Sequence, residues 1–202
     1  MENINLNLDE KRLLLKDYNH RLNNDLQALL AFIKLQKRFG IDNDEILNFT
    51  FISISSISII QNLMYYADNE ENLISIVEFF EEFIKTLNDY YSKSGIGFSH
   101  EIEKDFYINP KKMFHVMCLI NEMINLSIAF SVKNNSKNEI SLNLEKVEDD
   151  CLLTYSDNVS DIKEMNDESN LRTTLFELLL KQIDGNLESS DNSVISIKFN
   201  YN

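Results

Sequence analysis

Apolar residues at helical spacing dominate the first part of the chain. Between about Asp9 and Phe39 they recur every three, four or seven positions, which is typical of one buried stripe on an α-helix. The stripe consists of Leu15, Leu22, Leu26, Leu29 and Ile33. Gly40 supplies a helix stop, and Asp42 or Asn43 can cap a second helix. The pattern therefore predicts a long helix followed by a tight reversal.

The next stretch, "ILNFTFISISSISIIQNLMYY", is locally ambiguous because isoleucine and phenylalanine also favour strands. Strict alternation fails twice, whereas helical spacing is continuous through Phe51, Ile54, Ile57, Ile60 and Met64. We therefore predict a second helix, antiparallel to the first. Because two such helices cannot hide both stripes alone, we expect the hairpin to pair with a second copy as a four-helix bundle.

Helices and strands alternate in the rest of the chain. The polar run Asp68–Asn72 is the expected boundary between a domain of residues 1–67 and a domain of residues 68–202. Beyond it the patterns predict helices at Val77–Tyr91, Pro110–Phe130 and Leu171–Ile183, and strands at Gly97–Glu103, Glu139–Leu144, Cys151–Tyr155 and Val194–Tyr201. This order predicts an α+β fold in which helices cover one face of an antiparallel sheet.

Charge and composition narrow the classes of function. The 33 acidic and 19 basic residues give a net charge of −14, which repels nucleic acid and anionic lipid surfaces. No apolar run looks long enough to span a bilayer and the N-terminus lacks a secretory pattern, so we expect a cytoplasmic protein with no membrane contact. With four glycines in all, neither a P-loop nor a dinucleotide fingerprint occurs. Cys118 and Cys151 are expected to be buried thiols, not metal ligands.

His20 is the most informative candidate for chemistry. It lies outside the apolar stripe of its helix, on the polar face that also carries Asp17 and Asn24, so water or a partner protein can reach its ring. The alternative is an ordinary solvated surface histidine. His100, in an expected strand next to Glu101, and His115, in the expected helix after Pro110, are expected to be structural.

The segment around His20 resembles a known family. "HRLNNDLQALLAFIKLQ" is similar to the H-box of bacterial sensor histidine kinases of the HisKA_2 and HWE-related type, whose pattern is close to HRVKNNLQxxxxLLxLQ. The residues in register are His20, Arg21, Asn24, Leu26, Gln27, Leu35 and Gln36. Phe114–Phe130 resembles the N-box, and the C-terminal region resembles the end of a Bergerat-type ATPase domain. The resemblance implies a dimerisation and phosphotransfer hairpin followed by an ATPase-like α/β sandwich.

Several positions depart from the family pattern. Leu126 stands where the family has its Mg²⁺-coordinating asparagine, and Asn125 is one residue, about 100°, away from that place. The family motif Asp-Asn-Gly-x-Gly becomes Asp157–Asp161 without its glycines, and the later Gly-Leu-Gly loop becomes Asn170–Arg172. Side chains there would obstruct the approach of backbone to phosphates. We therefore expect a degenerate domain that binds no nucleotide and no metal, with a vestigial site at Asn121, Asn125 and Asp157. Asn121 is expected on a helix face and Asp157 in a solvated turn.

A chain that keeps the histidine helix without nucleotide chemistry suggests a histidine phosphotransferase. The resemblance implies that His20 accepts a phosphoryl group from one response-regulator receiver aspartate and passes it to another, with Mg²⁺ supplied by the receiver domain. Arg21 would neutralise phosphoryl oxygens, Asn24 would hydrogen-bond the ring or the phosphate, and Asp17 would orient the other ring nitrogen. Two alternatives remain open: a divergent, active sensor histidine kinase, and a non-enzymatic dimeric adapter that binds a response regulator.

Overall fold

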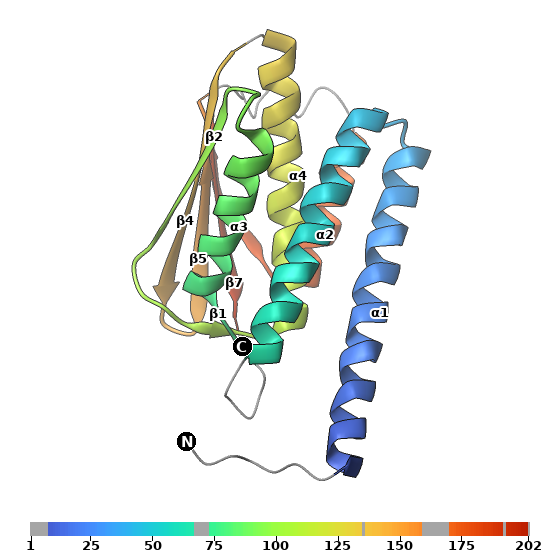
Figure 1. Cartoon of the computed structure of the whole chain (residues 1–202). Coiled ribbons are helices and arrows are strands. Elements are labelled where there is room, and N and C mark those ends of the chain that lie inside the picture. Colours follow the sequence, from blue (N-terminus) through green and yellow to red (C-terminus); the bar gives the residue numbers. More distant parts are fainter. Residues whose placement is uncertain (1–7, 67–72, 135, 159–169, 192, 202) are drawn as a thin grey trace.

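The computed structural model describes residues 8–66, 73–134, 136–158, 170–191 and 193–201. Its elements in chain order are α1 (Leu8–Arg38), α2 (Asn43–Tyr66), β1 (Ile74–Ser75), α3 (Ile76–Tyr91), β2 (Ile96–Ile102), β3 (Tyr107–Ile108), α4 (Pro110–Asn134), β4 (Asn138–Val147), β5 (Asp150–Ser156), α6 (Asn170–Gln182), β6 (Asn186–Asp191) and β7 (Val194–Asn200) (Figure 1). The expected domain boundary at Asp68–Asn72 lies outside the described residues.

The first two helices form an antiparallel pair, as the apolar spacing predicts (Figure 1). The turn between them uses Gly40 at φ 74°, a left-handed conformation that glycine adopts without steric cost. Asp42 then caps α2, because its side chain accepts a hydrogen bond from the backbone N–H of Asp44 at 2.9 Å. Local turn chemistry thus fixes the reversal that brings α1 alongside α2.

A five-stranded mixed sheet forms the other side of the molecule. Its strand order is β2-β4-β5-β7-β6, and a separate short pair joins β1 to β3. The sequence predicts antiparallel strands, and that prediction is wrong for β2 and β4, which pair in parallel. They do so because the chain between them returns through α4, a helical crossover to the same end of the sheet. The remaining pairs are antiparallel.

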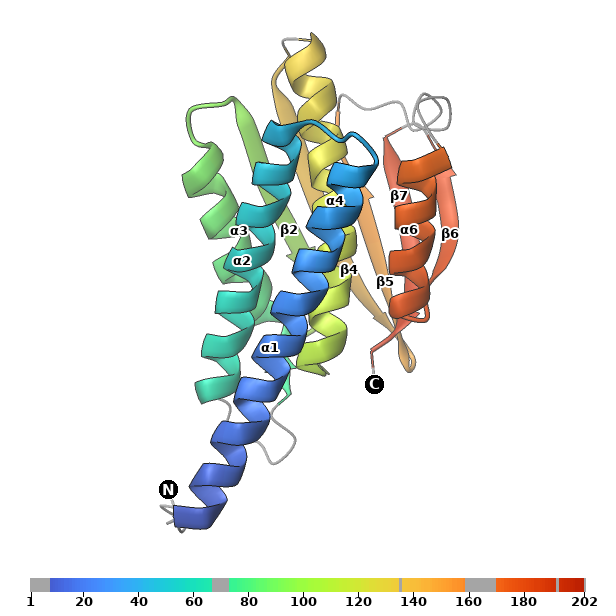
Figure 2. The same cartoon turned by 90° about the vertical axis from the view of Figure 1, so that its right-hand side faces the viewer.

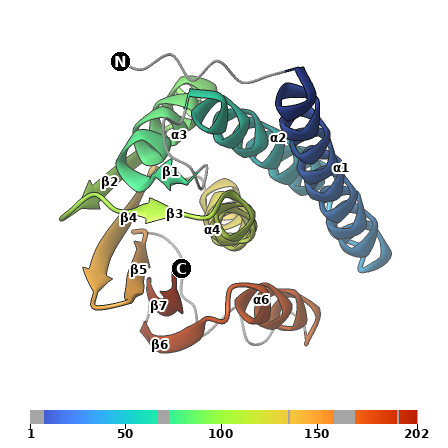
Figure 3. The same ribbon diagram turned by 90° about the horizontal axis from the view of Figure 1, so that it is seen from below.

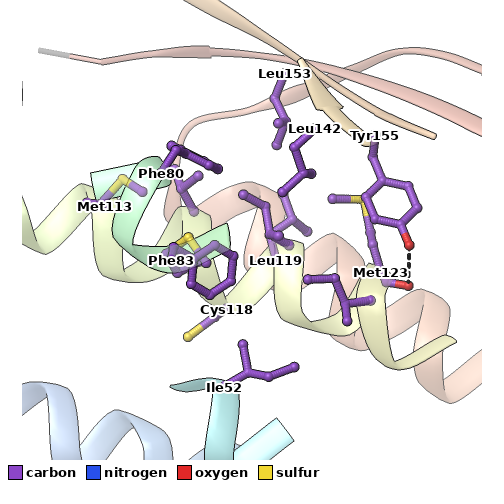
Figure 4. Packing of buried hydrophobic residues seen from close by; sticks show 14 of the residues in the cluster. Ile52, Phe80, Phe83, Met113, Cys118, Leu119, Met123, Leu142, Leu153 and Tyr155 are labelled. Carbon is purple, nitrogen blue, oxygen red and sulfur yellow. Dashed lines mark hydrogen bonds between the residues drawn. The ribbon is translucent and has the colours of Figure 1, made fainter. Parts of the chain in front are cut away.

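The helices form two layers over this sheet. Viewed along the helices, α4 lies between the sheet on one side and the α1–α2 pair on the other, with α3 and α6 beside it (Figure 3). One continuous apolar cluster runs from Leu29 and Phe49 through α3 and α4 to the inner face of the sheet. Figure 4 shows this packing, in which Ile52 of α2 and Leu142 of β4 approach α4 from opposite sides. The helical pair is therefore built onto the sandwich.

The buried face of α2 differs from the predicted stripe. Ile57 and Ile60 are buried as expected, but Ile54 is 52% exposed, and Ser53 and Ser56 face the core instead. The helix is apolar on almost every side, so spacing alone does not select the face that is buried. Because α3 and α4 of the same chain cover this face, a second copy is not needed to bury it.

Among the described residues, two helices meet the length and composition of a membrane span, contrary to the expectation from the sequence. They are α2 and residues Pro110–Val132 of α4. The α4 window is 78% buried inside the fold, as befits a central core helix, whereas the α2 window is 39% buried. The apolar character of α4 is thus accounted for by its position between the sheet and α2.

Candidate functional site

Helix α1 lies on the outside of the molecule (Figure 2). The side chain of His20 on this helix is exposed, as the helical pattern predicts. One turn further along, the side-chain amide of Asn24 contacts the ring, with 3.1 Å between Asn24 Nδ2 and His20 Nδ1. A spacing of four residues places the two side chains on the same face of the helix. The structure therefore brings together two of the four residues that the sequence singles out around the histidine.

The contact between His20 and Asn24 decides which ring nitrogen can act as a nucleophile. When the amide nitrogen donates to Nδ1, a neutral ring carries its proton on Nε2. When the amide is turned over, Nδ1–H donates to the amide oxygen and Nε2 keeps a free lone pair. Asn24 thus selects the ring tautomer, and the second orientation leaves Nε2 of an exposed histidine ready to attack phosphorus.

Arg21 is half-buried and lines a pocket of about 490 Å³ between α1, α2 and the start of α4. The side chain of Asp17 lies outside the described part of the structure, so its orienting role stays a prediction. The other lining residues are Asn24, Asp25, Ala28, Gln61, Met64, Asn109, Pro110, Lys111, Phe114 and His115. Asn24 therefore lies between the phosphoacceptor candidate His20 and this pocket: it contacts the His20 ring and lines the pocket.

The pocket changes the properties of two ionisable side chains. Burial raises the pKa of Asp25 to about 6, against the opposing influence of the cationic Arg21 and Lys111. Burial also lowers the pKa of His115, which favours its neutral form. The sequence alone assigns no role to Asp25 or Lys111, because the two residues lie far apart along the chain and only the fold brings them to one pocket. Asp25 follows Arg21 by one helical turn, so their proximity is predictable. The approach of Lys111 on α4 to this pair depends on the fold.

Asn121, a residue of the expected vestigial nucleotide site, is fully buried and binds α2. Its Nδ2 donates to the backbone carbonyl of Phe49 at 2.7 Å and to Ser53 Oγ at 2.8 Å. The amide side chain therefore fastens α4 to α2. Asn125 is also buried, and its Oδ1 has no hydrogen-bond partner among the described residues. Leu126, at the family's metal-ligand position, is half-buried.

A second buried polar contact joins the two helical layers. Gln36 Nε2 of α1 donates to Glu122 Oε1 of α4, and both side chains are buried. Gln36 belongs to the segment that resembles the H-box, and Glu122 belongs to the segment that resembles the N-box. The two segments are thus hydrogen-bonded to each other in the folded chain.

Asp157 does not lie in a solvated turn, and that expectation is wrong. Its side chain is 9% exposed and accepts a hydrogen bond from Ser127 Oγ, which also contacts the Tyr155 hydroxyl. Tyr155 in turn donates to the Met123 carbonyl at 3.2 Å (Figure 4). Burial raises the pKa of Tyr155 well above its ordinary value, so this hydroxyl stays protonated.

Two segments of the expected nucleotide loops are only partly described. Residues 159–161 lie outside the described residues, and the side chains of Asn170–Arg172 are likewise not described, although that segment opens α6. In the described part, Asp157 is held by Ser127 through a hydroxyl that stands in the N-box-like segment. The carboxylate is thus engaged by its own chain.

Comparisons with known proteins relate the chain to histidine kinases. Residues 17–91 match the family HisKA_2, described as histidine kinase. The fold is similar to the histidine kinase domain of the blue-light activated histidine kinase EL346 from Erythrobacter litoralis, with a TM-score of 0.66 and 12% identity over 93% of this chain and 90% of that one. The comparison with curated proteins found no match.

Two further solved structures share the fold. A longer chain of the Erythrobacter litoralis EL346 kinase gives a TM-score of 0.69 at 12% identity, covering 99% of this chain and 62% of that one. The histidine kinase AdeS of Acinetobacter baumannii gives a TM-score of 0.51 at 15% identity, covering 91% and 98%. The chain thus spans less than two thirds of the longer EL346 structure. These likenesses show that the chain has the fold of histidine kinase domains, and residues 17–91 match the HisKA_2 family model.

Proposed function

We propose that the chain acts in two-component signalling as a histidine phosphotransferase, because residues 17–91 match the histidine kinase family HisKA_2 and the chain carries the fold of histidine kinase domains. In this proposal His20 receives a phosphoryl group from a response-regulator receiver domain and returns it to a receiver aspartate. The exposed ring of His20, held by Asn24, is the observation that carries the proposal.

The transfer requires little from this chain beyond a positioned imidazole. Nε2 of His20 attacks the phosphorus of an aspartyl phosphate, a nitrogen–phosphorus bond forms, and the oxygen–phosphorus bond breaks to release the aspartate carboxylate. In the amide orientation that leaves Nε2 free, Nδ1–H keeps its proton and donates a hydrogen bond to the side-chain oxygen of Asn24. The loose transition state is stabilised mainly by positioning and by charge, which Arg21 supplies from this chain and which Mg²⁺ and a lysine supply from the receiver.

The fate of the N-box-like residues supports transfer without autophosphorylation. The Asn121 side chain is hydrogen-bonded to α2, and the Asp157 carboxylate accepts a hydrogen bond from Ser127. Leu126 replaces an oxygen ligand with a hydrocarbon, which cannot coordinate Mg²⁺. A nucleotide would have to displace these internal contacts before it could bind there. We therefore propose that the chain holds no nucleotide or metal cofactor of its own.

A homodimer is part of the same proposal. Apolar side chains remain exposed on the helical pair: Leu26 at 39%, Leu30 at 54%, Leu47 at 64% and Ile54 at 52%. A second copy that covers them would complete a four-helix bundle and leave the polar face of α1, with His20, open to receivers. The net charge of −14 favours protein partners over nucleic acid, and we place the protein in the cytoplasm with its receivers.

The proposal is tested by phosphoryl transfer from a labelled receiver. Wild-type protein, His20→Ala and His100→Ala are mixed with a receiver whose aspartate carries labelled phosphate. We expect label on wild-type protein and on His100→Ala but none on His20→Ala. Equal labelling of wild-type protein and His20→Ala would refute the role of His20, and tight receiver binding without label on any variant would favour the adapter.

Nucleotide binding discriminates the transferase from a divergent kinase. Calorimetric titration with Mg²⁺ and ATP is expected to give no saturable heat on the wild-type chain. Saturable binding accompanied by labelling of His20 from ATP would instead establish the divergent kinase.

A further inference from the structure

The pocket beside α1 is separate from the residues that resemble a nucleotide site. It is bounded by α1, α2 and the first turns of α4, and it reaches α4 at Asn109–His115. Asn121, Asn125 and Asp157 are not among its lining residues. Its volume of about 490 Å³ falls within the range of small-molecule sites. The pocket is therefore a candidate site distinct from those nucleotide-like residues, and it shares Arg21 and Asn24 with the proposed transfer site.

The residues that line the pocket favour an anionic ligand that also carries an apolar group. Arg21 and Lys111 contribute two cationic side chains, and α4 begins there with no acidic residue in its first turn. Ala28, Met64 and Phe114 contribute apolar surface. The volume exceeds the need of a bare oxyanion, so the apolar surface has room to hold an organic group.

Gln61 of α2 adds an unsatisfied polar group at the same place. Its side chain is 7% exposed, it lines the pocket, and its Oε1 has no hydrogen-bond partner among the described residues. A buried amide oxygen without a partner costs free energy that a hydrogen-bond donor on a ligand can recover. The pocket thus combines two cations, an apolar wall and one buried amide oxygen, to which the P–OH group of a singly charged phosphate can donate a hydrogen bond.

We propose that this pocket binds a small organic phosphate, whose phosphate contacts Arg21 and Lys111 and whose organic group packs against Met64 and Phe114. The inference goes beyond the proposed phosphotransfer and does not require it. Such a ligand would be an effector and not the phosphoryl donor, because His20 is not part of the pocket wall.

Asp25 makes the binding sensitive to pH. The groups that face it are Arg21 on α1 and Lys111, His115 and Cys118 on α4. Since burial raises its pKa to about 6, the Asp25 carboxyl takes up a proton as the pH falls towards that value. An ionised carboxylate repels the phosphate and a protonated one does not, so affinity rises as the pH falls. Asp25→Asn mimics the protonated form at every pH.

The ligand and His20 communicate through Asn24. Its side chain lines the pocket and also contacts His20 Nδ1. A phosphate that accepts a hydrogen bond from the Asn24 amide nitrogen turns the amide oxygen towards His20, which selects the tautomer with a free Nε2. An occupied pocket therefore alters the imidazole of His20 before any phosphoryl transfer takes place.

Calorimetric titration of the full chain with phenyl phosphate tests the proposal. We expect saturable binding at pH 5.5, weaker binding at pH 7.5, and a loss of about tenfold or more in Lys111→Gln. The matched control Lys34→Gln removes an exposed lysine of α1 and should bind as the wild-type chain does. Asp25→Asn should bind more tightly than wild-type at pH 7.5 and equally well at pH 5.5 or nearly so. This comparison cancels the titration of the ligand itself.

The ligand class is tested with inorganic phosphate and phenol as separate probes. Each should bind at least tenfold more weakly than phenyl phosphate, because inorganic phosphate contacts only the cationic side chains and phenol contacts only the apolar ones. Absence of saturable phenyl phosphate binding, equal binding by inorganic phosphate, or unchanged binding in Lys111→Gln with native thermal unfolding would overturn the assignment. His20→Ala should still bind phenyl phosphate, so a failure of phosphotransfer does not decide the outcome here.

The coupling to His20 is read from the imidazole proton resonances in NMR spectra. Phenyl phosphate should shift the His20 resonances of wild-type protein, and Asn24→Ala should abolish that shift while binding persists. A His20 resonance that does not move when the wild-type pocket is saturated would contradict the coupling.

Discussion

Replacing Asn121 with alanine tests whether this residue fastens the helical pair to the sandwich. The side chain is completely buried and donates two hydrogen bonds to α2, to the Phe49 carbonyl at 2.7 Å and to Ser53 Oγ at 2.8 Å. Each such bond contributes about 1 kcal/mol net, and the truncation leaves both acceptors short of a donor. We therefore expect Asn121→Ala to lower the free energy of unfolding by about 2 kcal/mol.

Thermal and urea unfolding followed by circular dichroism measure this loss. For a chain of this size about 2 kcal/mol corresponds to a fall in Tm of roughly 4–8 °C. Asn62→Ala, at an exposed position of α2, is the matched control and should change stability by less than about 0.5 kcal/mol. An unchanged Tm in Asn121→Ala, or a loss as small as that of the control, would refute the structural role of Asn121.

Three further variants probe the contacts around the site. Asp25→Asn should raise Tm at pH 7.5 but not at pH 4.5. Folding raises the pKa of this carboxyl to about 6, so the carboxyl lowers the stability of the fold increasingly as the pH rises from about 4 to 6, and by a constant amount above pH 6. A difference in Tm that does not vary with pH would contradict this. Gln36→Ala should destabilise the chain by about 2 kcal/mol in urea unfolding, since it removes the donor to the buried carboxyl of Glu122, and an unaltered urea midpoint would count against it. Asn24→Ala should slow transfer to His20 about fivefold to tenfold in a rapid-quench assay, as loss of one hydrogen bond to the ring implies; wild-type rates in this variant would remove Asn24 from the mechanism.

Helical periodicity predicts the elements better than it predicts their contacts. The apolar stripe defines α1, and a single left-handed glycine after it explains the reversal. The same reasoning places α2 but selects Ile54 for the core, whereas the structure buries Ser53 and Ser56, whose small side chains face the core. A helix that is apolar on all sides carries no signal for its partner. The short strands β1 and β3 and the polar strand β6 also lack the alternation that reveals a strand.

In the candidate site too, contacts within one helix are predictable from the sequence, and contacts between distant segments are not. His20 and Asn24 are four residues apart on one helix, so their proximity is predictable from the sequence. The pocket joins Arg21 of α1 to Lys111 of α4, and only the packing of α4 under the helical pair brings them together. Asn121 looks like a remnant of a nucleotide site in the sequence because its partners on α2 are far away along the chain.

Peptide mass spectrometry of the intact chain after exposure to two phosphoryl donors tests the central claim most directly. The chain is incubated separately with a phosphorylated receiver and with Mg²⁺ and ATP, digested without acid, and searched for one added phosphoryl group. We predict phosphate on His20 after exposure to the receiver and an unmodified His20 peptide after exposure to nucleotide. Phosphate on His20 from nucleotide alone, or an unmodified His20 peptide in both samples, would contradict it.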